Sequence, residues 1–476
     1  MLFPSVVFLA YFAPLFLCAY FLLPWKNLTF LLFSLAFFFW GETKYTGILL
    51  AYVAINYIFG LLVGKSRSSS QRKWALAFGV AANCGMLAYY KYFAFFLQAV
   101  LPDLFGIRVE DFHHPHLPLG ISYFTFHGIS YLIDVYRGVA TCSASPLNVG
   151  LYIAMFPHMV AGPIVRYHTI AKALVRRCFT VRRITFGLRL FAIGMAQKML
   201  IANNAAVVAD AVFALPAATL NAQAAWLGAL AYTLQIYFDF CGYSFMAIAL
   251  GIILGFRLPR NFRYPYFSQS ITEFWRRWHI SLSTWFRDYL YIPLGGNRKG
   301  QGRTLINLIL VFFLCGLWHG AAYTFIAWGM FHGMMLVIER VGLKRLLARA
   351  PRLLRHAYAV LVVMLGWVLF RAENIGQAGG VYLAMFGLNA APEAKTIFEL
   401  ASNEKILAII VGLIFATPLL ERLGKRMAKT LQQSVGRTPY RAMALPMQTI
   451  WTILLFVVSY IYILAGSYSP FLYFRF

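Results

Sequence analysis

The 476-residue chain contains little charge and few cysteines. Asp, Glu, Lys and Arg make up only 12% of the residues, with 15 acidic against 42 basic side chains. Such a low charged fraction lies outside the range of soluble domains. The six cysteines are scattered without paired spacing, so we expect neither disulfide bonds nor zinc. The segment His113-His114-Pro115-His116 has no cysteine partner, and we expect solvated loop rather than a metal site there.

Several catalytic signatures are also absent from the sequence. It contains no Gly-x-Ser-x-Gly elbow, no phosphate-binding Gly-x4-Gly-Lys loop and no Gly-x-Gly-x-x-Gly fingerprint. Hydrolase, ATPase and dinucleotide-dependent functions therefore lack support. No histidine is followed five positions later by Asp, so the His-x4-Asp signature of soluble-type acyltransferases is missing too.

Long apolar runs dominate what is present, and 61% of the residues are hydrophobic. A membrane-spanning helix needs about 20 consecutive apolar residues. Runs that approach or exceed this length are residues 4–24, 45–64, 74–100, 222–256 and 447–466. The sequence therefore predicts an all-α polytopic integral membrane protein with ten to eleven transmembrane helices. No basic residue or small-residue cleavage pattern marks the first run as a signal peptide, so we expect it to be retained.

The formal charge of +27 is concentrated between the apolar runs, which favours membrane topology over nucleic-acid binding as its explanation. Basic loops are predicted to be cytoplasmic, and they are residues 65–73, 166–183, 257–303, 340–355 and 422–441. Acidic loops at 101–116 and 372–405 are predicted to face the opposite side.

This alternation fails at two places, each of which predicts a re-entrant segment. Two apolar segments, 117–133 and 149–165, occur where a single crossing is required. We favour the second as the irregular one because Pro157, Gly162 and Pro163 interrupt a helix. The backbone groups freed there must find partners within the protein.

The second failure surrounds His319, where both flanking loops are basic. The arm 305–317 has 13 residues, or roughly 20 Å of helix against a hydrocarbon core of ~30 Å. We therefore expect Trp318-His319-Gly320 to form a turn near mid-depth. An ionisable group there is expensive to place and points to function.

Other polar groups within apolar runs have either a structural or a functional explanation. They are His127, Asp134, His158, Asp239 and His332. A hydrogen bond between helices is a common role of an intramembrane histidine, and we favour it for His332. Asp239 lies between two phenylalanines and requires a partner or a raised pKa.

His279 lies in an aromatic and basic stretch, residues 273–285. As one helix, this stretch would place Trp275, Trp278, His279, Leu282 and Trp285 on one face. Arg276 and Arg277 would point away, as in an amphipathic helix on the membrane surface. The following loop contains Arg298 and Lys299 among glycines, a weak signal for binding phosphate.

Four motifs occur in order along the chain: Phe156-Pro157 with Gly162-Pro163-Ile164, Phe238-Asp239-Phe240-x-Gly242-Tyr243-Ser244, Phe274-Trp275-Arg276-Arg277-Trp278-His279, and Trp318-His319-Gly320. Together they resemble the membrane-bound O-acyltransferase (MBOAT) family, and most closely its members that O-acetylate bacterial exopolysaccharides such as alginate. The resemblance covers essentially the whole chain. It implies one membrane domain, 1–476, with peripheral helices in 1–100, a catalytic core in 117–340 that includes the cytoplasmic loop 257–303, and carboxyl-terminal helices in 356–476.

The resemblance also implies a catalytic histidine within a tunnel, which corresponds to His319, and a second polar position, which corresponds to His279. Further tunnel candidates are Trp318, Asp239 and Trp278. Basic residues of the cytoplasmic loop are candidates to hold the phosphates of the donor, because arginine pairs well with phosphate oxygens. They are Arg276, Arg277, Arg298 and Lys299.

The implied reaction moves an acetyl group from cytoplasmic acetyl-coenzyme A across the bacterial inner membrane to periplasmic acetyltransferase partners, with no permanently bound cofactor. Two alternatives remain open at this point. A solute transporter would use His319 and Asp239 as a mid-membrane pathway. A different family member would transfer D-alanyl groups to teichoic acids or acetylate cellulose or peptidoglycan.

Overall fold

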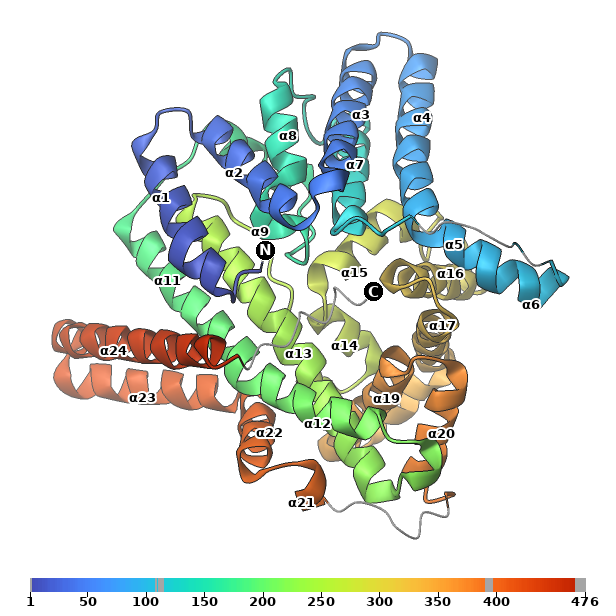
Figure 1. Ribbon diagram of the computed structural model, residues 1–476, viewed down its shortest axis with the longest axis vertical. Coiled ribbons are helices and arrows are strands. Elements are labelled where there is room, and N and C mark those ends of the chain that lie inside the picture. Colours follow the sequence, from blue (N-terminus) through green and yellow to red (C-terminus); the bar gives the residue numbers. More distant parts are fainter. Residues whose placement is uncertain (1, 108, 110–114, 390–396, 467–476) are drawn as a thin grey trace. The chain divides into compact units, whose positions relative to one another are not determined.

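The computed structural model describes residues 2–107, 109, 115–389 and 397–466, and in that part of the chain every regular element is a helix (Figure 1). Eight helices there are long and apolar enough to cross a membrane, or nine if a bent pair counts as one span. The eight are Thr43–Lys65, Ser69–Phe105, Val181–Phe213, Ala222–Ile253, Gln301–His319, Tyr323–Arg349, Arg352–Arg371 and Thr438–Leu464. Two shorter apolar helices, Val7–Leu22 and Lys26–Gly41, lie near the amino end. The protein is therefore an all-α, multi-pass membrane protein, as predicted.

The chain forms two compact units. Unit 1 comprises residues 1–187 and 246–259, and unit 2 comprises residues 188–245 and 260–476. The boundary falls within α11 (Val181–Ala196) and within α13 (Ala222–Ile253). The single membrane domain expected from the sequence stays a prediction.

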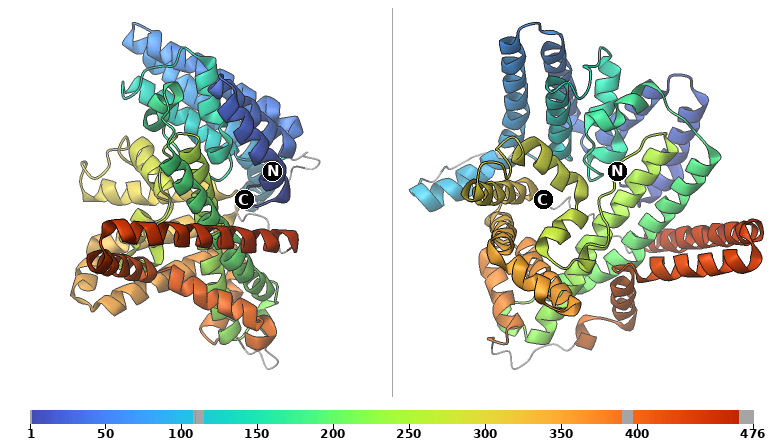
Figure 2. Two further views of the ribbon diagram at one scale, coloured as in Figure 1. Left: turned by 90° about the vertical axis from the view of Figure 1, so that its left-hand side faces the viewer. Right: turned by 180° about the vertical axis from the view of Figure 1, so that it is seen from behind.

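Unit 1 is built around α7 (Ile121–Tyr136), nearly all of whose side chains are buried. It packs against α3 (Thr46–Lys65) and α4 (Ser69–Leu87), which lie side by side as neighbouring blue helices (Figure 2). Asn56 of α3 and Asn83 of α4 exchange side-chain hydrogen bonds of 3.0 and 3.1 Å, and both are fully buried. Pairing these amides with each other avoids the cost of leaving them unsatisfied in an apolar bundle.

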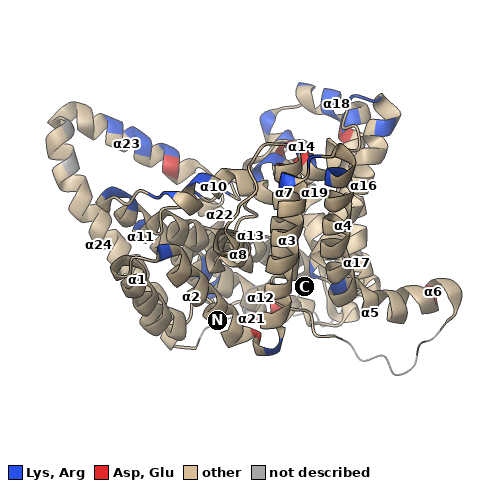
Figure 3. Ribbon diagram, turned by 90° about the horizontal axis from the view of Figure 1, so that it is seen from above, with Lys and Arg blue, Asp and Glu red and all other residues tan. Residues whose placement is uncertain are grey.

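Within its described residues, unit 2 contains twelve complete α-helices, which are α12 (Asn203–Phe213), α14 (Ile271–Arg277), α15 (Ile280–Phe286), α16 (Gln301–His319), α17 (Tyr323–Ile338), α18 (Lys344–Arg349), α19 (Arg352–Arg371), α20 (Ile375–Met385), α21 (Ile397–Leu400), α22 (Asn403–Phe415), α23 (Leu419–Val435) and α24 (Arg437–Leu464). Lys and Arg residues of α18 and α23 lie along one edge of this unit, whereas acidic residues of α12 and α21 lie toward the other (Figure 3). This asymmetry agrees with the loop charges from which the cytoplasmic side was predicted.

The predicted helix break in 149–165 is confirmed. Helix α8 (Pro146–Ala154) ends where Met155 leaves the helical region at φ −59° and ψ 113°, and α9 (Phe156–Met159) forms a single turn before the bend at residues 160–162. By contrast, α7 is continuous over the alternative segment.

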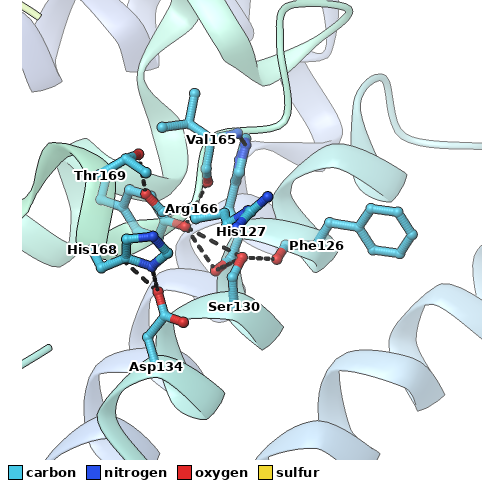
Figure 4. A network of polar contacts seen from close by, with 9 residues as sticks. Phe126, His127, Ser130, Asp134, Val165, Arg166, His168 and Thr169 are labelled. Carbon is cyan, nitrogen blue, oxygen red and sulfur yellow. Dashed lines mark hydrogen bonds and ion pairs between the residues drawn. The ribbon is translucent and has the colours of Figure 1, made fainter. Parts of the chain in front are cut away.

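The backbone groups freed by this break find partners within unit 1. The Val165 N–H donates to Nε2 of His127 at 3.3 Å, and the Val165 carbonyl accepts from the Tyr152 hydroxyl at 2.9 Å. Next to them, Asp134 accepts hydrogen bonds from the backbone N–H of His168 at 3.2 Å and from its ring at 2.8 Å (Figure 4). These contacts give His127 and Asp134 the structural role that the sequence left open.

Candidate functional site

His319 is the last residue of α16, which forms a hairpin with α17 in unit 2. The predicted arm of 13 residues is wrong, because the helix begins at Gln301 and has 19 residues. At ~1.5 Å per residue its length is about 28 Å, close to the thickness of the hydrocarbon core. The hairpin therefore exists, but its length does not require His319 to lie at mid-depth.

Small residues bring the two helices of the hairpin into backbone contact. A Cβ atom at Gly316 would overlap the carbonyl oxygen of Phe325, and one at Gly329 would overlap the carbonyl oxygen of Phe312. Gly320, directly after His319, has no room for a Cβ against the ring of Phe325. Glycine at these positions permits close helix packing, as is common between membrane helices. The turn that carries His319 is held by that packing.

Aromatic rings enclose the imidazole of His319, which is 4% exposed. The ring centroid of His319 lies 4.8 Å from that of Trp318, 5.0 Å from that of Trp328 and 5.2 Å from that of Phe370, each at a steep angle. Trp328 and Phe370 come from α17 and α19. Neither residue was predicted as part of the site, because each lies in an ordinary apolar run.

The stretch 273–285 is not one helix, which corrects the prediction of a surface amphipathic helix. α14 ends at Arg277 and α15 begins at Ile280, with Trp278 extended and His279 in the left-handed region at φ 39° and ψ 54°. Only Tyr264 and His279 have positive φ among the non-glycine residues that the structure describes. A left-handed conformation is costly for residues other than glycine and persists where surrounding contacts impose it, often at functional sites.

The contacts that impose this conformation come from the segment before α14. Asn261 accepts from the backbone N–H of Ile280 through its carbonyl at 2.9 Å, and its side-chain oxygen accepts from the Ser281 hydroxyl at 2.6 Å. The Asn261 amide donates to Ser244 of α13 at 2.9 Å. Asn261 thereby links α13 to the first turn of α15. This residue was missed in the sequence because its partners are 17 and 20 positions away.

The structure brings His279 and His319 to the same tryptophan. The ring of His279 is fully buried, lies 4.6 Å from that of Phe240 and 6.1 Å from that of Trp318, and Trp318 is also the neighbour of His319. Burial lowers the pKa of His279 to about 3, because desolvation disfavours the charged imidazolium. His279 is therefore neutral near pH 7.

The other two tunnel candidates have well-defined packing partners. Asp239 forms an ion pair of 2.6 Å with Lys198, and both side chains are almost fully buried. Gly242, one turn further along α13, leaves room for the backbone next to Lys198. Trp278 packs between aromatic rings, with Trp367 at 4.8 Å. Asp239 thus has the charge partner that its burial requires.

A cavity of about 560 Å³ lies beside this cluster within unit 2. Its apolar lining includes Trp275, Phe312 and Cys315. Cys315 lies four residues before His319 and therefore on the same face of α16, one turn away. Four cations also line the cavity, and they are Arg276, Arg287, Arg340 and Lys344. The volume falls within the range of small-molecule sites.

Of the four predicted donor contacts, the structure places Arg276 in the lining of this cavity. Arg277 instead forms an ion pair with Glu273 at 2.5 Å. Arg298 and Lys299 are exposed and do not line the cavity. The other three cations of the cavity lining were not predicted, and they are Arg287, Arg340 and Lys344. Nothing in the sequence distinguishes them from other basic loop residues.

No metal-binding cluster is present among the described residues. His113 and His114 lie outside them. His116 is described, and its ring lies 3.2 Å from a carboxylate oxygen of Glu42.

Residues 137–373 match the model of the membrane-bound O-acyltransferase family. The chain is 42% identical to the probable alginate O-acetylase of Azotobacter vinelandii, over the full length of both proteins. The chain belongs to the membrane-bound O-acyltransferase family. It is also 42% identical to the probable alginate O-acetylase of Pseudomonas putida, again over both full lengths. Identity to the peptidoglycan O-acetyltransferase of Helicobacter pylori is 32%, over 100% of this chain and 98% of that one. This MBOAT protein is therefore an acyltransferase, which sets aside the solute-transporter alternative.

Proposed function

We propose that the protein transfers an acetyl group from cytoplasmic acetyl-coenzyme A across the bacterial inner membrane to a periplasmic acceptor that serves the O-acetylation of an exopolysaccharide. Alginate is the first candidate polymer, because relatives named as alginate O-acetylases match along their whole length. The acceptor is proposed to be a periplasmic acetyltransferase partner rather than the polymer itself.

The observation that carries this proposal is the cavity whose lining reaches Cys315, one helical turn before His319. Coenzyme A combines phosphate groups with a thioester on a flexible arm, and the cations Arg276, Arg340 and Lys344 suit its phosphates. The apolar lining suits the arm and the acetyl group.

In the proposed reaction, an imidazole nitrogen of His319 takes the proton of the acceptor hydroxyl while the hydroxyl oxygen attacks the acetyl carbonyl. The carbon–sulfur bond then breaks, and the protonated imidazole returns its proton to the sulfur, so that coenzyme A leaves as the thiol and His319 is neutral again. The aromatic enclosure of His319 excludes water, which would otherwise compete with the acceptor. His279 is proposed as the second polar residue of the site, acting beside Trp318.

The test uses the purified protein in vesicles, with acetyl-coenzyme A on the basic side and the acceptor on the other. Coenzyme A release, followed with a thiol reagent, should require both donor and acceptor. Release that is independent of the acceptor would overturn the transfer proposal. Repeating the assay with the acceptor proteins for peptidoglycan, cellulose or teichoic acid distinguishes the alternative polymers. Faster release of coenzyme A with any of these acceptors than with that for alginate would rule out alginate as the first candidate.

A further inference from the structure

Helix α23 separates apolar and basic side chains onto opposite faces. Its apolar residues recur every three or four positions and are 41–65% exposed; they are Leu420, Leu423, Met427, Leu431 and Val435. Cations occupy the opposite face at Arg422, Lys425, Arg426 and Lys429. No residue of this helix is buried in the structure. An exposed helix of this pattern is typical of one that lies in a membrane interface.

The helices on either side differ from α23. Helix α22 is apolar along most of its length and meets α23 at an angle of 62°. Helix α24 follows α23 directly and diverges from it after the turn that joins them (Figure 3). Four cations within 17 residues make α23 too costly to place across the hydrocarbon core. The bend at Pro418 therefore fits a turn from a span into the membrane surface.

The first turn of α23 is fixed to the loop before α14. The Tyr264 hydroxyl donates to the carboxylate of Glu421 at 2.8 Å, and the guanidinium of Arg422 lies 5.1 Å from the centre of the Phe267 ring. Lys425 forms an ion pair with Glu421. Arg426 and Lys429 form no ion pair with any residue that the structure describes. These two cations are therefore available to an external anion.

We propose that α23 lies in the cytoplasmic surface of the membrane and binds the phosphate headgroups of anionic phospholipids through Arg426 and Lys429. Its apolar face is then covered by acyl chains. Charge complementarity selects the occupant, because the cytoplasmic leaflet is negatively charged and attracts basic segments beside membrane spans. The basic edge of unit 2, to which α23 contributes, is the edge predicted to be cytoplasmic (Figure 3).

Spin labels on adjacent positions test the depth and the side of α23. Single cysteines replace Arg426 or Met427 in the full-length protein after its native cysteines have been changed to serine or alanine, with transferase activity as the check on folding. In vesicles of phosphatidylcholine and phosphatidylglycerol, the label at 427 should be accessible to oxygen and that at 426 to a water-soluble nickel complex. Equal nickel accessibility at both positions would overturn the proposal. Exclusion of both reagents at 427 would also overturn it, since a protein surface would then cover the apolar face.

Charge variants test the lipid chemistry. The pair Arg426→Gln with Lys429→Gln should lower phosphatidylglycerol retention by the detergent-purified protein, measured by native mass spectrometry, by roughly thirty-fold at low salt. The matched pair Arg426→Lys with Lys429→Arg keeps both charges and should retain the lipid. Equal retention by the two variants, or equal retention of phosphatidylcholine and phosphatidylglycerol by the natural chain, would contradict the proposal.

Discussion

The buried ion pair between Lys198 and Asp239 gives a quantitative prediction. Its atoms lie 2.6 Å apart with 4% and 2% of the two side chains exposed. Lys198→Met or Asp239→Leu removes one charge and leaves the other buried without its partner, which destabilises a protein by about 3–5 kcal/mol. The double variant removes both charges and should regain most of that loss. The coupling energy of the double-mutant cycle should therefore be about 3 kcal/mol or more.

The assay is unfolding of the detergent-purified protein, followed by intrinsic fluorescence, for the natural chain, the two single variants and the double variant. Arg277→Gln serves as a control because its ion pair with Glu273 is partly exposed and should contribute less than about 1 kcal/mol. Single variants within 1 kcal/mol of the natural chain would refute the reasoning. The double variant should also keep transferase activity. A stable double variant without activity would show instead that Asp239 belongs to the reaction pathway.

Three further predictions concern the hairpin, His279 and the cavity. Gly316→Val should force the hairpin helices apart, lowering stability by about 1–3 kcal/mol together with transferase activity, whereas a fully active and stable variant would contradict the packing. Because burial lowers the pKa of His279 to about 3 against ~6.5 unfolded, the unfolded state binds more protons below pH 6.5 and acid destabilises the fold. When the pH is changed from 7 to 5, the unfolding free energy of His279→Gln should therefore fall by about 2 kcal/mol less than that of the natural chain. Equal losses in the two proteins would contradict the burial of a neutral His279. Arg340→Ala with Lys344→Ala should raise the KM for acetyl-coenzyme A at least about tenfold with little change in kcat, while Arg298→Ala, which lies outside the cavity, should leave both constants unchanged.

The membrane class, the hairpin and the broken segment were predictable because they depend on local properties. Apolar length marks the spans, and Pro157, Gly162 and Pro163 remove backbone hydrogen bonds wherever they occur. The error at α16 has a local cause as well. Residues Gln301 to Thr304 were predicted to lie outside the helix because they are polar. A polar first turn can nevertheless continue into an apolar helix.

The conformation at His279 was not predictable in this way. The three-and-four spacing of residues 273–285 favours one helix, but hydrogen bonds that Ile280 and Ser281 donate to Asn261 break it. Likewise, the partner of Asp239 lies 41 positions earlier in the sequence, at Lys198. Such long-range contacts decide which conformation is lowest in free energy, and no local pattern reports them.

The most direct test of the proposed mechanism is coenzyme A release by His319→Ala in the vesicle assay. His319→Ala should remain folded, with an unchanged elution profile in detergent, and should still bind acetyl-coenzyme A in its cavity. Its acceptor-dependent release of coenzyme A should fall at least about a hundredfold, the lower end of the usual contribution of a general base. Release at the rate of the natural chain by a folded His319→Ala protein would contradict the assignment of His319 as the base.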